Sequence, residues 1–327
     1  MNNPAKVLRS EFDKEMQSVD QLINKYMTSD STPIISELSS HLINAGGKRL
    51  RPLLTIASAK MCGYSGNAHI QLAAAIEFIH SATLLHDDVV DESEKRRGKP
   101  TANSLWNNQS SVLVGDYLFS KSFQLMVEAE SLSVLSILAD ASATISEGEI
   151  LQLSAIRNLH TDVEVYFKII EGKTAALFSA ATKVGAVISN AEQDFVIALM
   201  NYGRFLGLCF QLTDDLLDYT GDEKSFGKKI GEDFREGKLT LPLIKAIERS
   251  TPKEQKFWKN SVQKPSQYDK NFEEGLAIME KYDTLDFTRN EAIKYSKKAF
   301  NSLDVFSNSE LKDILKQLAL KVVSRIN

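Results

Sequence analysis

The chain has 327 residues with a formal net charge of −4, and 43% of its residues are hydrophobic. This length can bury a large core, and the small net charge gives no general attraction to nucleic acids or anionic membranes. Only two cysteines occur, Cys62 and Cys209, which excludes a disulfide framework and favours buried thiols. With 16 glycines and 7 prolines, helix breakers are few, so helices are favoured over many short strands.

The first twenty residues carry charges every few positions and lack the apolar run of a signal peptide. No window of about 18 apolar residues is free of charges, so the sequence predicts no transmembrane helix. We therefore expect a cytoplasmic protein, although a hydrophobic ligand remains compatible with these features.

Helix signals recur along the whole chain. The segment 67–92 is apolar nearly all round and should be surrounded by other helices. The segment 195–219 is a second central candidate. Further helix starts are predicted by capping boxes at 161–164 and 251–254, and by Ser307 before a last amphipathic helix. We predict one all-α domain spanning residues 1–327, with two inner helices.

Both inner helices end in the same acidic pattern, D-D-x-x-D. The first acidic cluster is Asp87, Asp88 and Asp91, and the second acidic cluster is Asp214, Asp215 and Asp218. On a helix the outer two carboxylates of each cluster lie one turn apart on one face, where like charges repel. A lone cluster of this kind is most often a solvated helix end. Two of them on apolar helices favour a bound cation, and ligands that are all oxygen suit Mg²⁺.

A charged stretch that contains glycine follows each acidic cluster, at 92–101 and at 220–238. Neither stretch is assigned to a helix, and each lies where a mobile lid would be useful. Cations are available from these stretches and from elsewhere in the chain, namely Lys48, Arg49, Arg51, Arg96, Arg97, Lys173, Lys228, Lys229 and Lys238. Such side chains recognise phosphate oxygens, so carboxylates and cations together predict a site for one or two diphosphates.

The apolar helices that lead into the acidic clusters predict a hydrophobic tail on the substrate. A diphosphate neutralised by Mg²⁺ and cations becomes a good leaving group. A dry site could then shelter the resulting carbocation from water.

The chain resembles the trans-polyprenyl diphosphate synthases, particularly the bacterial long-chain octaprenyl type. The resemblance extends over nearly the whole chain, and no motif position departs from the family pattern. It is carried by G-G-K-R-L-R-P at 46–52, E-F-I-H-S-A-T-L-L-H-D-D-V-V-D-E-S at 77–93, R-R-G-K at 96–99, V-G-D-Y-L-F at 114–119, E-G-E at 147–149, K-T-A-A-L-F at 173–178, G-x-x-F-Q-L-T-D-D-L-L-D-Y at 207–219 and G-K-K-I-G-E-D at 227–233.

This resemblance implies an isoprenoid-synthase helical bundle around a central hydrophobic cavity, usually as a homodimer. It also implies head-to-tail 1′-4 condensation of isopentenyl diphosphate onto an allylic diphosphate such as farnesyl diphosphate. The product would be an all-trans polyprenyl diphosphate of octaprenyl length for quinone side chains. The allylic primer and the choice between ubiquinone and menaquinone are left open.

The resemblance also implies roles for individual residues. Magnesium on the allylic diphosphate would be held by Asp87, Asp91, Asp214 and Asp218, with Asp88 and Asp215 in support. Isopentenyl diphosphate would be bound by Lys48, Arg51, His80 and Arg97. The allylic diphosphate would be bound by Arg96, Lys173, Thr174, Gln211, Lys228 and Lys238, with Lys229 as an alternative to Lys228. Lys173 and the six aspartates form the implied catalytic set, with roughly two or three Mg²⁺ ions and no side-chain nucleophile.

Helical geometry agrees with part of this assignment. His80 precedes Asp87 by seven residues, and Gln211 precedes Asp218 by seven, so each pair lies on one helix face. On the residue type alone, however, a histidine such as His80 on an apolar face is more often a core residue than a ligand contact.

Product length is predicted from the residues before the first acidic cluster. Ala82 and Thr83 are small, whereas family members that make short products tend to place a bulky aromatic residue there. The channel should therefore continue past this point to a floor, for which Met126 and Leu138 are candidates. Both could equally be ordinary core residues.

Three alternatives to this long-chain prediction stand beside it. A shorter-chain synthase, making geranylgeranyl or farnesyl diphosphate, would differ only in the channel. A terpene cyclase also uses D-D-x-x-D and Mg²⁺, but a second diphosphate site with Lys48, Arg51 and Arg97 would be unnecessary. A non-catalytic partner subunit would be expected to lose aspartates from one cluster, and none is missing here.

Overall fold

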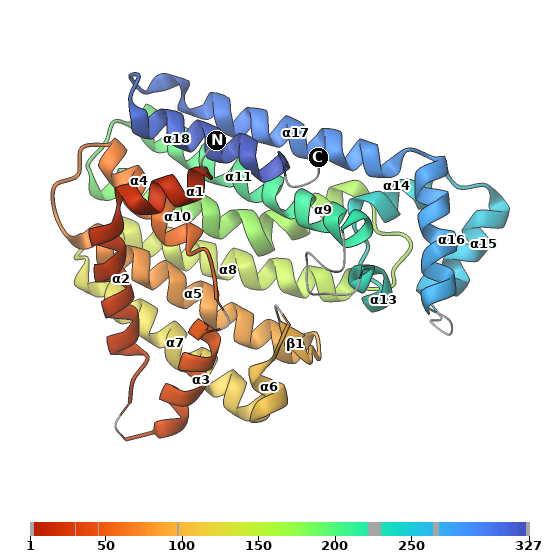
Figure 1. Ribbon diagram of the computed structural model, residues 1–327, viewed down its shortest axis with the longest axis horizontal. Helices are drawn as coiled ribbons and strands as arrows, with labels where there is room; N and C mark the ends of the chain where they lie inside the picture. The colour runs from red at the N-terminus through yellow and green to blue at the C-terminus, as the bar shows by residue number, and fades with distance from the viewer. Residues whose placement is uncertain are drawn as a thin grey trace. The chain divides into compact units, whose positions relative to one another are not determined.

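A computed structural model describes residues 3–29, 31–44, 46–96, 98–221, 230–263 and 268–324, with side chains undescribed at Asn44, Tyr268 and Asp269. Almost all of this described chain is helical, which confirms the all-α prediction (Figure 1). The chain separates into two compact units. Unit 1 comprises residues 1–142, 177–203 and 302–315, and unit 2 comprises 143–176, 204–301 and 316–327.

Unit 1 is built around one long helix from the N-terminal half of the chain. Its elements are α1 (Pro4–Glu11), α2 (Asp13–Tyr26), α3 (Pro33–Asn44), α4 (Leu50–Met61), α5 (Ala68–Val90), β1 (Lys95–Arg96), β2 (Lys99–Pro100), α6 (Ala102–Leu105), α7 (Asn108–Glu128), most of α10 (Ala176–Ile188), η2 (Leu303–Val305) and the first parts of α8 (Leu132–Ala155), α11 (Gln193–Thr220) and α18 (Glu310–Val323). Within this unit α5 packs most extensively on α7, and also on α2 and α4.

Helix α5 corresponds to the predicted inner helix at 67–92. Its fully or almost fully buried apolar residues are Leu72, Ala73, Ala74, Ala75, Ile76, Phe78, Ile79, Ala82 and Leu85. Because these residues occupy every face of the helix, α5 has no continuous polar side to present to water. Four of them are alanines, whose short side chains let neighbouring helices approach closely.

Unit 2 is built mainly from helices in the C-terminal half of the chain. Its elements are the second parts of α8 and α11, α9 (Val163–Ile170), η1 (Glu171–Ala175), α13 (Glu232–Glu236), α14 (Leu241–Arg249), α15 (Pro252–Val262), α16 (Tyr268–Lys281), α17 (Thr284–Ser302) and the end of α18. An aromatic cluster of Phe234, Trp258 and Phe272 packs edge to face between α13, α15 and α16. This cluster anchors the short helix α13, which carries part of the candidate site.

The helix caps confirm one predicted helix start and correct two others. The capping box at Thr251 is confirmed, because Thr251 and Glu254 exchange hydrogen bonds between side chain and backbone. Helix α9 is capped by Asp162 rather than Thr161, since the Asp162 carboxylate accepts from the Val165 amide at 2.8 Å. The last helix begins at Glu310, and the Ser309 hydroxyl, not Ser307, accepts from the Lys312 amide.

Among the described residues of 92–101 none is helical, as predicted. The stretch 220–238 was also expected to lie outside helices, but it contains α13. Lys95–Arg96 pairs with Lys99–Pro100 as a short antiparallel hairpin. Gly98 has a φ of +76°, a backbone conformation that glycine adopts without strain.

Two helices, α5 and α11, are long and apolar enough to span a membrane by length and composition alone. More than half of the apolar window in each is buried inside the protein, at 61% for α5 and 56% for α11. Their apolar surfaces therefore already have packing partners within the fold.

Candidate active site

The first acidic cluster ends α5 in unit 1, and its middle residue differs from the outer two. Asp88 is 2% exposed, and its Oδ1 accepts from Arg96 Nε at 2.9 Å and pairs with Arg96 Nη2 at 2.8 Å. Asp87 and Asp91 are half-buried. The middle carboxylate is therefore neutralised by Arg96, whereas the outer two carboxylates keep partial access to solvent.

This pairing bears on the predicted role of Arg96. The family resemblance implied that Arg96 binds the allylic diphosphate. In the structure its guanidinium forms an ion pair with Asp88. The hairpin of β1 and β2 carries Arg96 back to the end of α5. Arg97, predicted to bind isopentenyl diphosphate, lies outside the described residues.

His86, near the end of α5, contacts two residues of α7. Its Nε2 lies 3.2 Å from the Val112 carbonyl oxygen and 3.4 Å from Asp116 Oδ1. A Cβ on Gly115 would come within 2.3 Å of the same ring nitrogen, so a larger residue there would displace the imidazole from this position. The V-G-D motif thus packs against the residue that precedes Asp87.

The unit 1 residues predicted to bind isopentenyl diphosphate differ in their exposure to solvent. Lys48 is exposed and His80 is half-buried. The Arg51 guanidinium lies 4.3 Å from the centre of the Phe178 ring. Burial lowers the pKa of Arg51 to about 10, against the opposite influence of Glu77. Since the group stays charged at neutral pH, Arg51 is a desolvated cation, which binds an anion more strongly than a solvated one.

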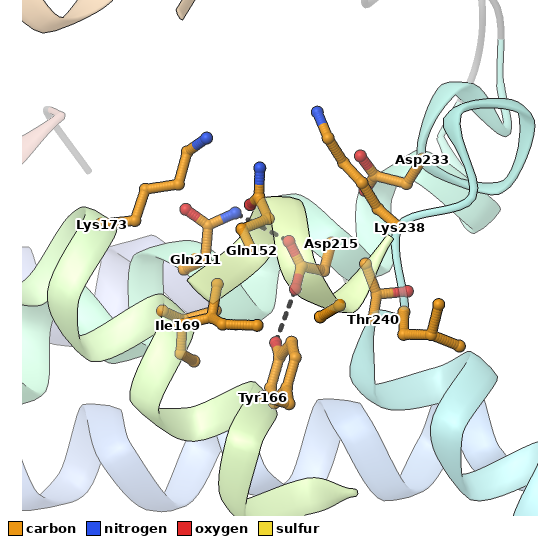
Figure 2. A pocket seen from close by; sticks show the side chains of 12 residues that line it. Gln152, Tyr166, Ile169, Lys173, Gln211, Asp215, Asp233, Lys238 and Thr240 are labelled. Atoms are coloured by element: carbon orange, nitrogen blue, oxygen red, sulfur yellow. Dashed lines mark hydrogen bonds between the residues drawn. The ribbon is translucent and has the colours of Figure 1, made fainter. Parts of the chain in front are cut away.

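The second acidic cluster lies near the end of α11 in unit 2, and its middle residue is also held inside (Figure 2). Asp215 is buried and accepts from Tyr166 Oη at 2.5 Å and from Gln211 Nε2 at 2.7 Å. The Thr174 hydroxyl donates to Gln211 Oε1 at 2.6 Å. A continuous hydrogen-bonded chain therefore joins Thr174, Gln211, Asp215 and Tyr166.

Asp218 is held by the start of α13. Its carboxylate accepts from the backbone amides of Glu232 at 3.2 Å and Asp233 at 3.1 Å, and its carbonyl accepts from the Gly231 amide. Gly231 has a φ of +78°, and a Cβ there would meet the Phe272 ring. This explains the glycine in the G-E-D motif, because only glycine combines that turn with that close contact.

Negative charge accumulates in this part of unit 2. Burial and the charge of Asp233 raise the pKa of Asp215 to about 7, although hydrogen bonds from Tyr166 and Gln211 act in the opposite direction. Burial and Asp233 likewise raise the pKa of Asp218 to about 8, against the two backbone amides. A cation among these carboxylates would relieve the repulsion and favour their ionised forms.

A pocket in unit 2 brings several predicted residues together. Its lining includes Lys173, Gln211, Asp215, Asp233 and Lys238. In Figure 2 the ammonium groups of Lys173 and Lys238 point to the same side of the pocket. Lys173 pairs with Glu149 at 2.9 Å, and Lys238 pairs with Glu236 at 2.6 Å.

Three of the residues predicted for the allylic diphosphate therefore line one pocket, and Thr174 contacts one of them. Lys228 and its alternative Lys229 lie outside the described residues. The pocket lining also includes Tyr166, Gln152 and Asp233, which were not predicted from the sequence. Asp233 could have been found, since it ends the quoted G-K-K-I-G-E-D motif, whereas no quoted motif contains Tyr166.

The segment that carries Lys173 is a π-helical turn, η1, inserted between α9 and α10. It lies against α8, where a Cβ on Gly172 would come within 2.9 Å of the Thr144 carbonyl oxygen. A Cβ on Gly148 would come within 2.7 Å of the Lys173 amide nitrogen. Two glycines thus allow the two backbones to come into contact. The wider turn presents Lys173 to the pocket and Thr174 to Gln211.

The carboxylates of the two acidic clusters are the candidate ligands for Mg²⁺. Within the described part of the chain, no three His, Cys, Asp or Glu side chains converge to form a metal site. The outer carboxylates of a cluster would supply two oxygen ligands, and Mg²⁺ commonly takes the others from water and substrate phosphate. The oxygen-only donors and the accumulated negative charge fit such an ion.

Comparisons with known proteins agree with the family resemblance of the sequence motifs. A family model described as polyprenyl synthetase matches residues 32–279. The octaprenyl diphosphate synthase of Haemophilus influenzae is 40% identical over 96% of this chain and 94% of its own length. Relatives named for other product lengths also match.

Solved structures give equally extensive matches. A decaprenyl diphosphate synthase from Rhodobacter capsulatus superposes with a TM-score of 0.96 at 51% identity, covering 99% of both chains. A polyprenyl synthase from Caulobacter crescentus, solved with calcium and isoprenyl diphosphate, has a TM-score of 0.94 at 46% identity, covering 98% of both chains.

Proposed function

Because the chain belongs to the polyprenyl synthetase family and is a prenyltransferase, we propose that it makes a long all-trans polyprenyl diphosphate. It would condense isopentenyl diphosphate onto an allylic diphosphate such as farnesyl diphosphate, to octaprenyl length, for quinone side chains in the cytoplasm. The observation that carries this proposal is the unit 2 pocket, where two lysines flank the Thr174–Gln211–Asp215 chain of hydrogen bonds.

We propose Mg²⁺ as the cofactor of this enzyme. Asp87 and Asp91 would hold it in unit 1, and Asp214 and Asp218 would hold it in unit 2. A bound Mg²⁺ neutralises diphosphate oxygens and so makes the diphosphate a better leaving group. The calcium in the Caulobacter crescentus complex supports an oxygen-ligated divalent ion in a protein of this family.

The chain's own residues would hold and orient the substrates. Lys173 and Lys238 would bind the allylic diphosphate, and Gln211 would keep Asp215 in place beneath it. Lys48, His80 and the half-buried Arg51 would bind isopentenyl diphosphate. The allylic C–O bond breaks, C4 of isopentenyl diphosphate bonds to the allylic C1, and the released diphosphate accepts the proton lost from C2.

The proposal of a long product rests on the residues of α5 and its neighbours. Ala82 is small and 1% exposed, so its own side chain would not block a channel that passes this level of α5. Met126 and Leu138 are also buried and are kept as the candidate channel floor.

The expected activity is tested directly with the purified protein. Incubation with Mg²⁺, farnesyl diphosphate and isopentenyl diphosphate should give a long polyprenyl diphosphate, sized by chromatography, and EDTA should abolish it. Asp214→Asn should lower turnover by at least roughly 100-fold, because it weakens the stabilisation of the departing diphosphate. Asp313→Asn, at an exposed position on α18, is the control. A product of fewer units would refute only the length, whereas no condensation would refute the function.

We also propose a homodimer that uses the exposed apolar residues of α7 and the start of α8. Leu113, Val127 and Leu132 are 67%, 65% and 84% exposed, and Leu113 and Val127 lie near one face of α7. Large apolar residues exposed on neighbouring turns and helix ends are typical of an interface. Light scattering should give twice the chain mass, and Leu113→Asp with Val127→Asp should shift it toward the monomer. A monomeric wild-type protein would contradict this assignment.

A further inference from the structure

Arg49 has an unusual backbone at a decisive place in unit 1. It stands between Lys48 and α4 in the G-G-K-R-L-R-P motif, with φ of 44° and ψ of 46°. This left-handed conformation is disfavoured for a residue with a long side chain, so something must hold it there.

An ion pair with α2 supplies that restraint. Arg49 Nη1 lies 3.1 Å from Asp20 Oδ1, and Asp20 Oδ2 accepts from Arg9 Nη2 at 3.1 Å. The Arg49 side chain is 15% exposed and that of Asp20 is 31% exposed, so water screens this pair only partly. Asp20 thereby joins α1 and α2 to the residue that precedes α4.

The two sides of Arg49 differ in how firmly packing holds them. On the α4 side, Pro52 to Ala59 are all buried, which fixes the helix and Arg51 with it. On the other side Gly46, Gly47 and Lys48 are exposed, and Gly46 has a φ of +82°. The left-handed turn at Arg49 therefore sets the direction in which the backbone runs from Lys48 into α4.

We propose that Arg49 and Asp20 are positioning residues for the diphosphate of isopentenyl diphosphate. The ion pair holds the left-handed turn, and the turn sets Lys48 at a fixed separation from Arg51. This inference rests on the proposed function, and neither residue needs to touch the substrate.

The test measures steady-state kinetics and thermal unfolding of the full-length enzyme. Arg49→Gly accepts the left-handed backbone but loses the ion pair, and Asp20→Asn removes the charge from the other side. Both should raise KM for isopentenyl diphosphate by at least roughly tenfold, because misplaced binding groups lose substrate affinity steeply. KM for the allylic substrate and kcat should change little, and Arg49→Lys should restore most of the lost affinity.

A matched control joins the same two helices elsewhere. Lys60 on α4 lies 3.5 Å from Glu15 on α2, so Glu15→Gln removes an ion pair between α2 and α4 away from Lys48. It should leave KM unchanged. The proposal is wrong if Glu15→Gln raises KM equally. It is also wrong if the Arg49 and Asp20 variants have a lower melting temperature and an unchanged KM, because the ion pair would then contribute only to stability. If wild-type protein condenses and these variants match it, only this inference fails; if wild type does not condense, the proposed function fails too.

Discussion

Gly172→Ala is expected to cost most of the condensation activity and to lower the melting temperature. The added methyl group would lie 2.9 Å from the Thr144 carbonyl oxygen and 3.0 Å from the Gly148 Cα. Both are backbone atoms, so relief requires α8 and η1 to move apart. Overpacking of this kind typically costs about 1–3 kcal/mol of stability. Lys173 and Thr174 would move with η1, and a shift of about 1 Å at a binding group can lower the rate roughly 100-fold.

Gly185→Ala is the matched control for this variant. Its methyl group would also meet backbone, with the Ala59 nitrogen at 2.7 Å and the Thr55 carbonyl oxygen at 2.8 Å. It should reduce stability by a similar amount and leave the KM for the allylic substrate nearly unchanged. Full activity and an unchanged melting temperature in Gly172→Ala would show that η1 does not need the close contact.

Ala82→Phe is expected to shorten the product by several isoprene units while condensation continues. Ala82 is buried on α5, five residues before Asp87, so a ring there would project into the space proposed for the growing chain. Because the diphosphate-binding residues are untouched, the first condensations should still occur. The variant should also lose about 1–3 kcal/mol of stability from overpacking.

Chromatographic sizing of the products checks this expectation. Ala82→Ser keeps a small side chain and should give the wild-type length. Full-length product from Ala82→Phe, with wild-type turnover, would place the growing chain along a different path.

The sequence predicted the broad structure well because that structure depends on local patterns. The apolar segments 67–92 and 195–219 correspond to α5 and α11, since helical periodicity and the absence of breakers are local properties. The predicted cap at Thr161 was wrong by one residue. Thr161 and Asp162 are both good capping residues, and the backbone conformation at the start of α9 decides which of them caps the helix.

The partners of the acidic clusters could not be predicted in this way. Spacing identified the outer aspartates of each cluster as one pair, but it gave no sign that Asp88 and Asp215 turn inward. Their partners come from a hairpin eight residues on and from Tyr166, 49 residues away. Contacts of this kind depend on tertiary packing. The ion pair of Asp20 with Arg49 was missed for the same reason.

The π-helical turn η1 has a consequence for insertions and deletions in related chains. A helix advances about 100° per residue, so the additional residue in a π turn rotates everything before it relative to everything after it. Loss of one residue between 171 and 175 would restore a regular helix. The faces of α9 and α10 would then be out of phase, and either Tyr166 or Phe178 would leave its buried position. Alignments of such chains should therefore tolerate no length change across these five positions, even where the residues themselves vary.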